Sequence, residues 1–212
     1  MRKIILLTFF ISAALFSQSR FEADAPFISG LVGAAKVNLS GNSSSNPLSF
    51  AFGGSFGIPI IKNLYLYTRS SYSSQSNFQS FYNTSYINNS LQATNDFQEI
   101  NSSFSQLLVN GGLLYNFLLS EEFVIGFNGG VSFMVINQEA RLRTGTVISS
   151  IENENIWGAF GGVIVEKRWE ESDFTTFFEA QYNYAKSDAL YRTDALSAMN
   201  YTFGVRYYLA GR

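Results

Sequence analysis

Large apolar residues alternate with small or polar residues in eight separate stretches of this chain. Successive side chains of a β-strand point to opposite faces, so a period of two predicts a strand with one apolar and one polar face. The last stretch shows the pattern most clearly, because Tyr201, Phe203 and Val205 alternate with Thr202 and Gly204. The eight predicted strands cover residues 27–39, 48–58, 64–75, 105–118, 123–137, 156–169, 174–186 and 199–209.

The connections between these strands alternate in length. The short ones are residues 59–63, 120–122 and 170–173. The longer ones are residues 40–47, 76–104, 138–155 and 187–195. Short turns on one side and long loops on the other are typical of an up-and-down β-barrel in a membrane. The longest connection is rich in Ser, Asn, Gln and Tyr, and we expect it to be a mobile extracellular loop.

Two Asn-Gly pairs lie within the predicted strands. Asn110-Gly111 and Asn128-Gly129 are strong signals for a two-residue hairpin turn, and such turns would split two strands into short pieces. The apolar period, however, continues through both pairs without a shift. We therefore interpret them as glycines within strands, where they relieve crowding in a curved sheet. The hairpin interpretation is the alternative.

The composition of the polar face indicates which side of the sheet meets water. In a soluble barrel of the lipocalin type, Lys, Glu and Asp would cover the outside and large apolar residues would fill the interior. Here the polar face carries mainly Gly, Ser, Asn, Gln and Ala, which suits a narrow packed interior. Charged residues make up 14% of the chain, against ~25% in a typical globular domain. We predict an all-β fold, an eight-stranded antiparallel up-and-down transmembrane β-barrel, because only a closed sheet satisfies every backbone group in lipid.

The first residues have the organisation of a secretory signal peptide. Arg2 and Lys3 precede an apolar run, and Ser17 and Ser19 offer small residues for cleavage. An uncleaved membrane anchor is the alternative, but the run is shorter than the ~20 residues needed to cross a bilayer. We therefore expect residues 1–19 to be a signal peptide cleaved near 17–19, and residues 20–212 to form one outer-membrane barrel domain.

Six charged residues fall on the face that we assign to the interior. An eight-stranded barrel is just wide enough inside for side chains, and buried charges persist mainly when they are paired. If the last two strands pair, Glu179 and Arg206 become near-diagonal neighbours. We predict an internal ion-pair network, centred on Glu166 and Glu179, that plugs the barrel, and a proton or ion path is the alternative. The six residues are Lys36, Arg69, Glu166, Arg168, Glu179 and Arg206.

The residue types also limit the chemistry. The chain has no histidine, which removes Ser-His-Asp triads, and no cysteine, which removes disulfides and thiolate metal sites. Two carboxylate pairs, Asp188 with Asp194 and Glu152 with Glu154, have the pattern of solvated loop charges. The formal net charge of −2 favours no nucleic-acid partner. We expect no enzymatic activity, no cofactor and no metal site.

The C-terminal strand contains a further pattern, in which Gly204, Tyr207 and Leu209 follow Thr202. Together with the signal peptide, the eight alternating strands and the unequal connections, this pattern resembles the small outer-membrane β-barrel family, the OmpA/OmpX-like group of porin-family barrel domains. The resemblance implies that these four residues are part of the signal read during assembly of the barrel. Leu209 departs from the family, which usually has Phe at this place.

The resemblance implies an integral protein of the Gram-negative outer membrane, with short turns in the periplasm and long loops at the cell surface. Trp157 and Trp169 are expected in the two interfacial aromatic belts. The implied partners are outer-membrane lipids, lipopolysaccharide and the outer-membrane assembly machinery, and we expect a monomer. The leading hypothesis is a structural or surface-interaction barrel. The alternatives are a transport pore for small solutes or hydrophobic compounds, and a soluble periplasmic binding protein of the lipocalin type.

Overall fold

The computed structural model describes residues 25–39, 48–87, 90–142, 144–169, 172–186 and 195–209. The predicted signal peptide, residues 1–19, lies outside the described residues. The strands are β1 (Phe27–Leu39), β2 (Ser49–Ile61), β3 (Leu64–Ile87), β4 (Ser90–Leu118), β5 (Phe123–Leu142), β6 (Val147–Arg168), β7 (Phe174–Lys186) and β8 (Ala195–Tyr208). The predicted all-β class is therefore confirmed.

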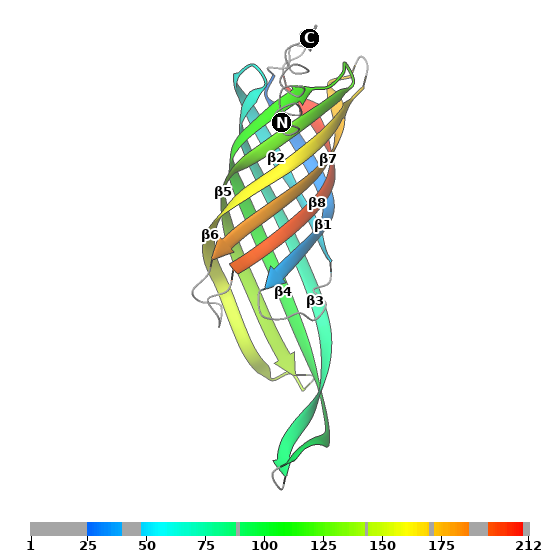
Figure 1. Cartoon of the computed structure of the whole chain (residues 1–212), viewed down its shortest axis with the longest axis vertical. Coiled ribbons are helices and arrows are strands. Elements are labelled where there is room, and N and C mark those ends of the chain that lie inside the picture. The colour runs from blue at the N-terminus through cyan, green and yellow to red at the C-terminus, as the bar shows by residue number, and fades with distance from the viewer. Residues whose placement is uncertain are drawn as a thin grey trace, which may run out of the picture.

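The eight strands form one closed antiparallel barrel in sequence order (Figure 1). Closure is made by β1 and β8, which pair from Phe27 opposite Tyr208 to Leu39 opposite Leu196. A closed sheet has no free edge along its wall, so the backbone groups of each strand are satisfied by its two neighbours. The predicted eight-stranded up-and-down topology is confirmed. Among the described residues, no helix is long and apolar enough to cross a membrane.

The short connections gather at one end of the barrel, which we call the turn end. In the β2–β3 turn Asn63 has a φ of 64°, a left-handed conformation that asparagine tolerates. In the β4–β5 connection the backbone N–H of Phe123 donates to Ser120 Oγ at 3.1 Å. The described chain also starts and finishes here, since the N–H of Leu209 donates to the carbonyl of Pro26 at 2.7 Å. We call the opposite end the loop end.

At the loop end, several strands are longer than predicted. β3 continues to Ile87 and β4 begins at Ser90, so most of residues 76–104 form an antiparallel ribbon, which extends beyond every other strand (Figure 1). The assignment of these residues to a loop was therefore wrong. The stretch contains neither Pro nor Gly to interrupt pairing, and it is rich in Tyr and Phe, which favour strands. β5 and β6 are extended in the same way, to Leu142 and from Val147.

The Asn-Gly pairs lie inside β4 and β5, so the hairpin alternative is wrong. A Cβ atom on Gly112 would lie 2.1 Å from the carbonyl oxygen of Gly129, and one on Gly130 would lie 2.3 Å from that of Gly111. The two strands therefore approach too closely at this level for any larger residue on the inner face. Adjacent glycines occur in four strands, namely Gly53-Gly54, Gly111-Gly112, Gly129-Gly130 and Gly161-Gly162. The missing side chains leave interior space that larger residues of other strands can fill.

Candidate functional site

A network of hydrogen bonds surrounds the buried carboxylate of Glu179 on the inner face of β7. Arg69 Nη1 donates to Glu179 Oε2 at 2.6 Å. Asn128 Nδ2 and the Tyr67 hydroxyl donate to Oε1 at 2.6 and 3.3 Å. These residues come from β3, β5 and β7, so the network joins three strands across the interior. We call Tyr67, Arg69, Asn128 and Glu179 the central cluster.

A second charged group lies nearer the turn end. Arg206 forms an ion pair with Glu166, and the Tyr208 hydroxyl donates to Glu166 Oε1 at 2.7 Å. The guanidinium of Arg206 lies 4.0 Å from the ring centroid of Phe27 and 5.1 Å from that of Phe177. Stacking of a cation against aromatic faces offsets part of the cost of removing it from water. We call Glu166, Arg206 and Tyr208 the turn-end cluster.

The structure places five of the six predicted charged residues inside the barrel, but it pairs them differently from the expectation. Arg206 lies opposite Thr175, whereas Glu179 lies opposite Thr202, four residues away along β8. The expected diagonal contact between Glu179 and Arg206 is therefore wrong, because the β7–β8 register separates them. Glu166 and Glu179 each hold one arginine, and Arg168 is also buried, with its guanidinium 5.9 Å from the ring centroid of Tyr208.

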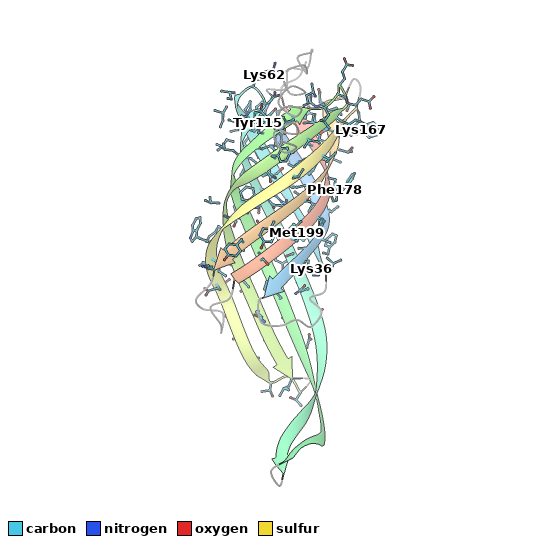
Figure 2. All side chains as sticks on the ribbon, viewed as in Figure 1. Lys36, Lys62, Tyr115, Lys167, Phe178 and Met199 are labelled. Carbon is cyan, nitrogen blue, oxygen red and sulfur yellow. The ribbon has the colours of Figure 1, made fainter. Side chains whose placement is uncertain are left out.

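Lys36 was assigned to the interior, and this assignment was wrong. The Lys36 side chain is exposed on the outer face of β1 (Figure 2), whereas Phe27 and Leu31 of the same strand are buried inside. β1 is apolar on both faces, since Ile28 and Val32 are exposed on the other side. Alternation within β1 therefore could not show which face points into the barrel. The pairing with β8 determines it.

Apolar side chains fill much of the interior around the charges, which the sequence analysis did not anticipate. One cluster packs around the polar residues and the other lies nearer the loop end. The first contains Phe27, Leu31, Tyr65, Tyr67, Leu114, Phe160, Ile164 and Phe177. The second contains Phe104, Leu108, Met134, Ile136, Ile156, Ala185 and Ala198.

Three partners of the carboxylates were also missed as site residues. Tyr67 lies two residues before Arg69, and Tyr208 lies two residues after Arg206, so both share the inward phase of a predicted buried charge. Asn128 was assigned to the inner face, but only as a small polar residue. A rule that selects inward-phase residues two positions from a buried charge would have found Tyr67 and Tyr208, whereas the predicted strand of Asn128 contains no charge.

The arrangement is suited to holding strands together. Both side chains of the Arg69–Glu179 pair have 0% exposure. Breaking such a buried pair by removing one partner typically costs about 3–5 kcal/mol, because the remaining charge stays buried without compensation. The ion pair and hydrogen bonds of the central cluster therefore stabilise this register of β3, β5 and β7 together with this packing of the interior.

The outer face carries an apolar belt between Trp157 of β6 and Trp169, which directly follows β6. Trp157 and Trp169 are 69% and 47% exposed, at the loop side and the turn end of β6. They are twelve residues apart in the sequence. At ~3.3 Å per residue and a typical tilt of ~45°, this spacing corresponds to a height of about 28 Å. Lys62, Tyr115 and Lys167 lie at the turn end, and Phe178 and Met199 on the wall (Figure 2).

The four residues of the C-terminal pattern occupy both faces of β8. Thr202 and Gly204 are buried inside, and Tyr207 and Leu209 are exposed. A Cβ on Gly204 would lie 2.5 Å from the ring of Phe177, so glycine is needed here for interior packing. Tyr207 packs against the ring of Phe174 at 4.8 Å between centroids. The role of these residues in assembly stays a prediction.

Among the described residues, no group of three His, Cys, Asp or Glu side chains could hold a metal ion. Glu152 and Glu154 lie on the loop-end extension of β6, and Asp188 and Asp194 lie outside the described residues. On the neighbouring extension of β5, Glu139 forms an ion pair with Arg141. The Glu139 carboxylate raises the pKa of Arg141 above its ordinary value.

No protein-family model and no curated protein matches the sequence. Solved structures of similar fold include the outer-membrane protein OprG from Pseudomonas aeruginosa, with a TM-score of 0.50, 12% identity and coverage of 89% of this chain and 98% of OprG. Neisserial surface protein A gives a TM-score of 0.48 at 14% identity, over 87% of this chain and 97% of that one. Ail, the attachment invasion locus protein of Yersinia pestis, gives 0.48 at 11% identity, over 88% and 100%.

At identities this low, the comparisons show similarity of fold alone. The chain has the closed eight-stranded architecture of the small outer-membrane β-barrels. The predicted resemblance to that group is therefore confirmed at the level of fold.

Proposed function

We propose that this chain is an integral outer-membrane barrel that exposes a contact surface built from extended strands outside the cell and does not conduct solutes. Membrane placement is supported by the height of the belt between Trp157 and Trp169, about 28 Å, which fits a hydrocarbon core of ~25–30 Å. It is also supported by the two faces of the wall. Phe127 and Phe203 are exposed, whereas Glu179 and Arg206 are buried inside.

The contact surface is the ribbon formed by residues 75–87 of β3 and residues 90–104 of β4, which we call the projecting ribbon. Its strands pair from Gln75 opposite Phe104 to Ile87 opposite Ser90. At ~3.3 Å per residue, the β3 arm has a length of about 40 Å. Because the ribbon continues strands of the wall, it is held by the barrel at a fixed place. This continuity carries the proposal, since a long ordered element beyond the membrane has no role in spanning it.

The closed interior is the second part of the proposal. Both charged clusters are buried, and the apolar cluster of Phe104, Leu108, Met134, Ile136 and Ile156 lies between the central cluster and the loop end. Water-filled pores need a polar lumen, and an apolar constriction opposes the passage of ions. We therefore favour a plugged barrel over a transport pore. Planar bilayers containing the purified chain should show no steady conductance, and a stable nanosiemens-scale channel would refute this part.

Lipid contacts follow from the same placement. Lys36 and Lys186 are exposed on the outer face toward the loop end, and Lys62 toward the turn end. In this orientation Lys36 and Lys186 would meet the phosphate groups of lipopolysaccharide, and Lys62 those of periplasmic-leaflet lipids. The C-terminal pattern would be read by the assembly machinery before insertion.

A ribbon-less variant tests the contact role. An Asn-Gly turn replaces residues 78–101 and joins Asn77 to Ser102, which are paired neighbours at the base of the ribbon. We expect the variant to remain folded, as judged by its heat-modifiable migration on gels, and to lose protein-dependent contacts of intact cells. A variant that folds and retains every contact of the full chain would contradict the role of the ribbon.

A further inference from the structure

The projecting ribbon has two strand edges beyond the barrel. Among the described residues, β2 pairs with β3 only as far as Ser74, and β5 pairs with β4 only as far as Ile100. From Gln75 to Ile87, therefore, β3 has β4 as its one paired neighbour in the described structure. A two-stranded ribbon is marginally stable in water, and a third strand stabilises it. The ribbon is thus an incomplete sheet at the place where a partner would approach.

The two edges differ in their protection against pairing. The β4 arm contains two charged residues, Asp96 and Glu99. It also contains a bulge, because β4 advances by four residues between the Tyr82–Phe97 and Thr84–Ala93 pairs, where β3 advances by two. Charges and bulges are the usual means of blocking an exposed edge. Residues 75–87 of β3 contain no charged residue, no proline and no glycine. The β3 edge is therefore the one open to a further strand.

We propose that this edge pairs with the same edge of a second copy held in a facing membrane, so that the protein joins two membranes by a four-stranded sheet. This inference rests on the proposed placement of the ribbon outside the cell. An uncharged edge rich in Asn, Gln, Ser and Tyr is compatible with itself, because pairing brings no like charges together. Two identical edges related by a two-fold axis form an isologous contact, and for strands this contact is antiparallel.

The antiparallel geometry determines where the second copy is. Figure 1 shows that the ribbon points away from the barrel along its long axis. Two copies in one membrane hold their β3 strands in the same direction, which is the wrong relation for antiparallel pairing. Two copies in apposed membranes hold them in opposite directions. The contact therefore forms between membranes, and each barrel stays monomeric within its own.

Vesicle clustering tests the proposal with the full chain. Two populations of phospholipid vesicles, each carrying the protein and one of two fluorescent dyes, should cluster, as measured by light scattering and dye proximity. Gln79→Lys places a charge near the middle of the β3 edge, opposite the uncharged Ile100 of β4, and we expect it to abolish clustering when both populations carry it. Pairing a Gln79→Lys population with a Gln79→Glu population should restore clustering. Gln92→Lys on the β4 arm is the matched control and should leave clustering unchanged.

The outcomes separate this inference from the proposed function. Chymotrypsin added outside the vesicles should cut the ribbon, which contains several Phe and Tyr residues. If the ribbon is cut but vesicles do not cluster, the second-copy inference is overturned and the exposed ribbon stands. Clustering with bare vesicles, or clustering that survives Gln79→Lys in both populations, also overturns it. If no ribbon is accessible from outside although the barrel is folded, the proposed function itself fails.

Discussion

Neutralising Glu179 should destabilise the barrel far more than neutralising an exposed carboxylate. Glu179→Gln keeps the side-chain volume but leaves the charge of Arg69 buried without a counterion. Both side chains of this pair have 0% exposure, so solvent cannot compensate for the loss. We expect the free energy of unfolding to fall by about 3–5 kcal/mol. At an m value of ~1–3 kcal/mol per molar urea, the midpoint of unfolding should fall by roughly 1–5 M.

The Glu139–Arg141 pair provides the matched control. Its side chains are 32% and 55% exposed, and pairs of this kind contribute about 0–1 kcal/mol. Glu139→Gln should therefore leave the urea midpoint nearly unchanged. Unfolding is followed by tryptophan fluorescence in lipid vesicles, with folded and unfolded forms separated by gel migration.

A double variant distinguishes charge compensation from simple packing. Arg69→Met combined with Glu179→Gln removes both charges at similar volume, and replacing a buried pair in this way is often neutral or stabilising. The double variant should therefore be more stable than Glu179→Gln alone. If it is less stable by the sum of the two single effects, or if Glu179→Gln behaves like the exposed control, the reasoning about the central cluster is refuted.

Further predictions concern the wall. Val163 of β6 lies midway between Trp157 and Trp169, so Val163→Arg should lower the free energy of unfolding by about 2–4 kcal/mol, against about 0–1 kcal/mol for Trp157→Arg at the interface. Equal losses in vesicle unfolding would contradict the belt. Gly112→Val should prevent folding, because its Cβ would meet the backbone of β5 at 2.1 Å. Gly111→Ala should fold normally, since no atom lies within 4 Å of its Cβ position, and heat-modifiable migration measures both outcomes.

Much of the fold could be predicted because one physical pattern dominates the sequence. Most strands carry their charged and small polar residues on one face, so the phase of Arg69, Glu166 and Glu179 followed from alternation alone. β1 was the exception, because Phe27 and Ile28 are both large and apolar. Its faces are decided by closure with β8, a contact between the two ends of the sequence that no local pattern reports.

Neither the pairing of the buried charges nor the ribbon could be predicted from the sequence, and the reasons differ. Which arginine pairs with which carboxylate depends on the register and stagger of all eight strands. A register shift of a few residues would place Arg206 instead of Arg69 beside Glu179. The ribbon was missed because Ser, Asn and Gln are common in loops. Strand pairing, once it is established in the wall, continues along β3 and β4 until a breaker intervenes, and residues 76–87 contain none.

The most direct test of the account measures what each face of β8 touches. The chain has no cysteine, so single cysteines can be labelled cleanly with nitroxides in lipid vesicles. Labels at Tyr201, Phe203 and Val205 should collide readily with dissolved oxygen, which concentrates in hydrocarbon, and rarely with a water-soluble nickel chelate. A label at Thr202, inside the packed barrel, should be shielded from both. If the nickel chelate reaches positions 201, 203 and 205 while position 202 reports hydrocarbon, the outer face does not meet lipid and the account is wrong.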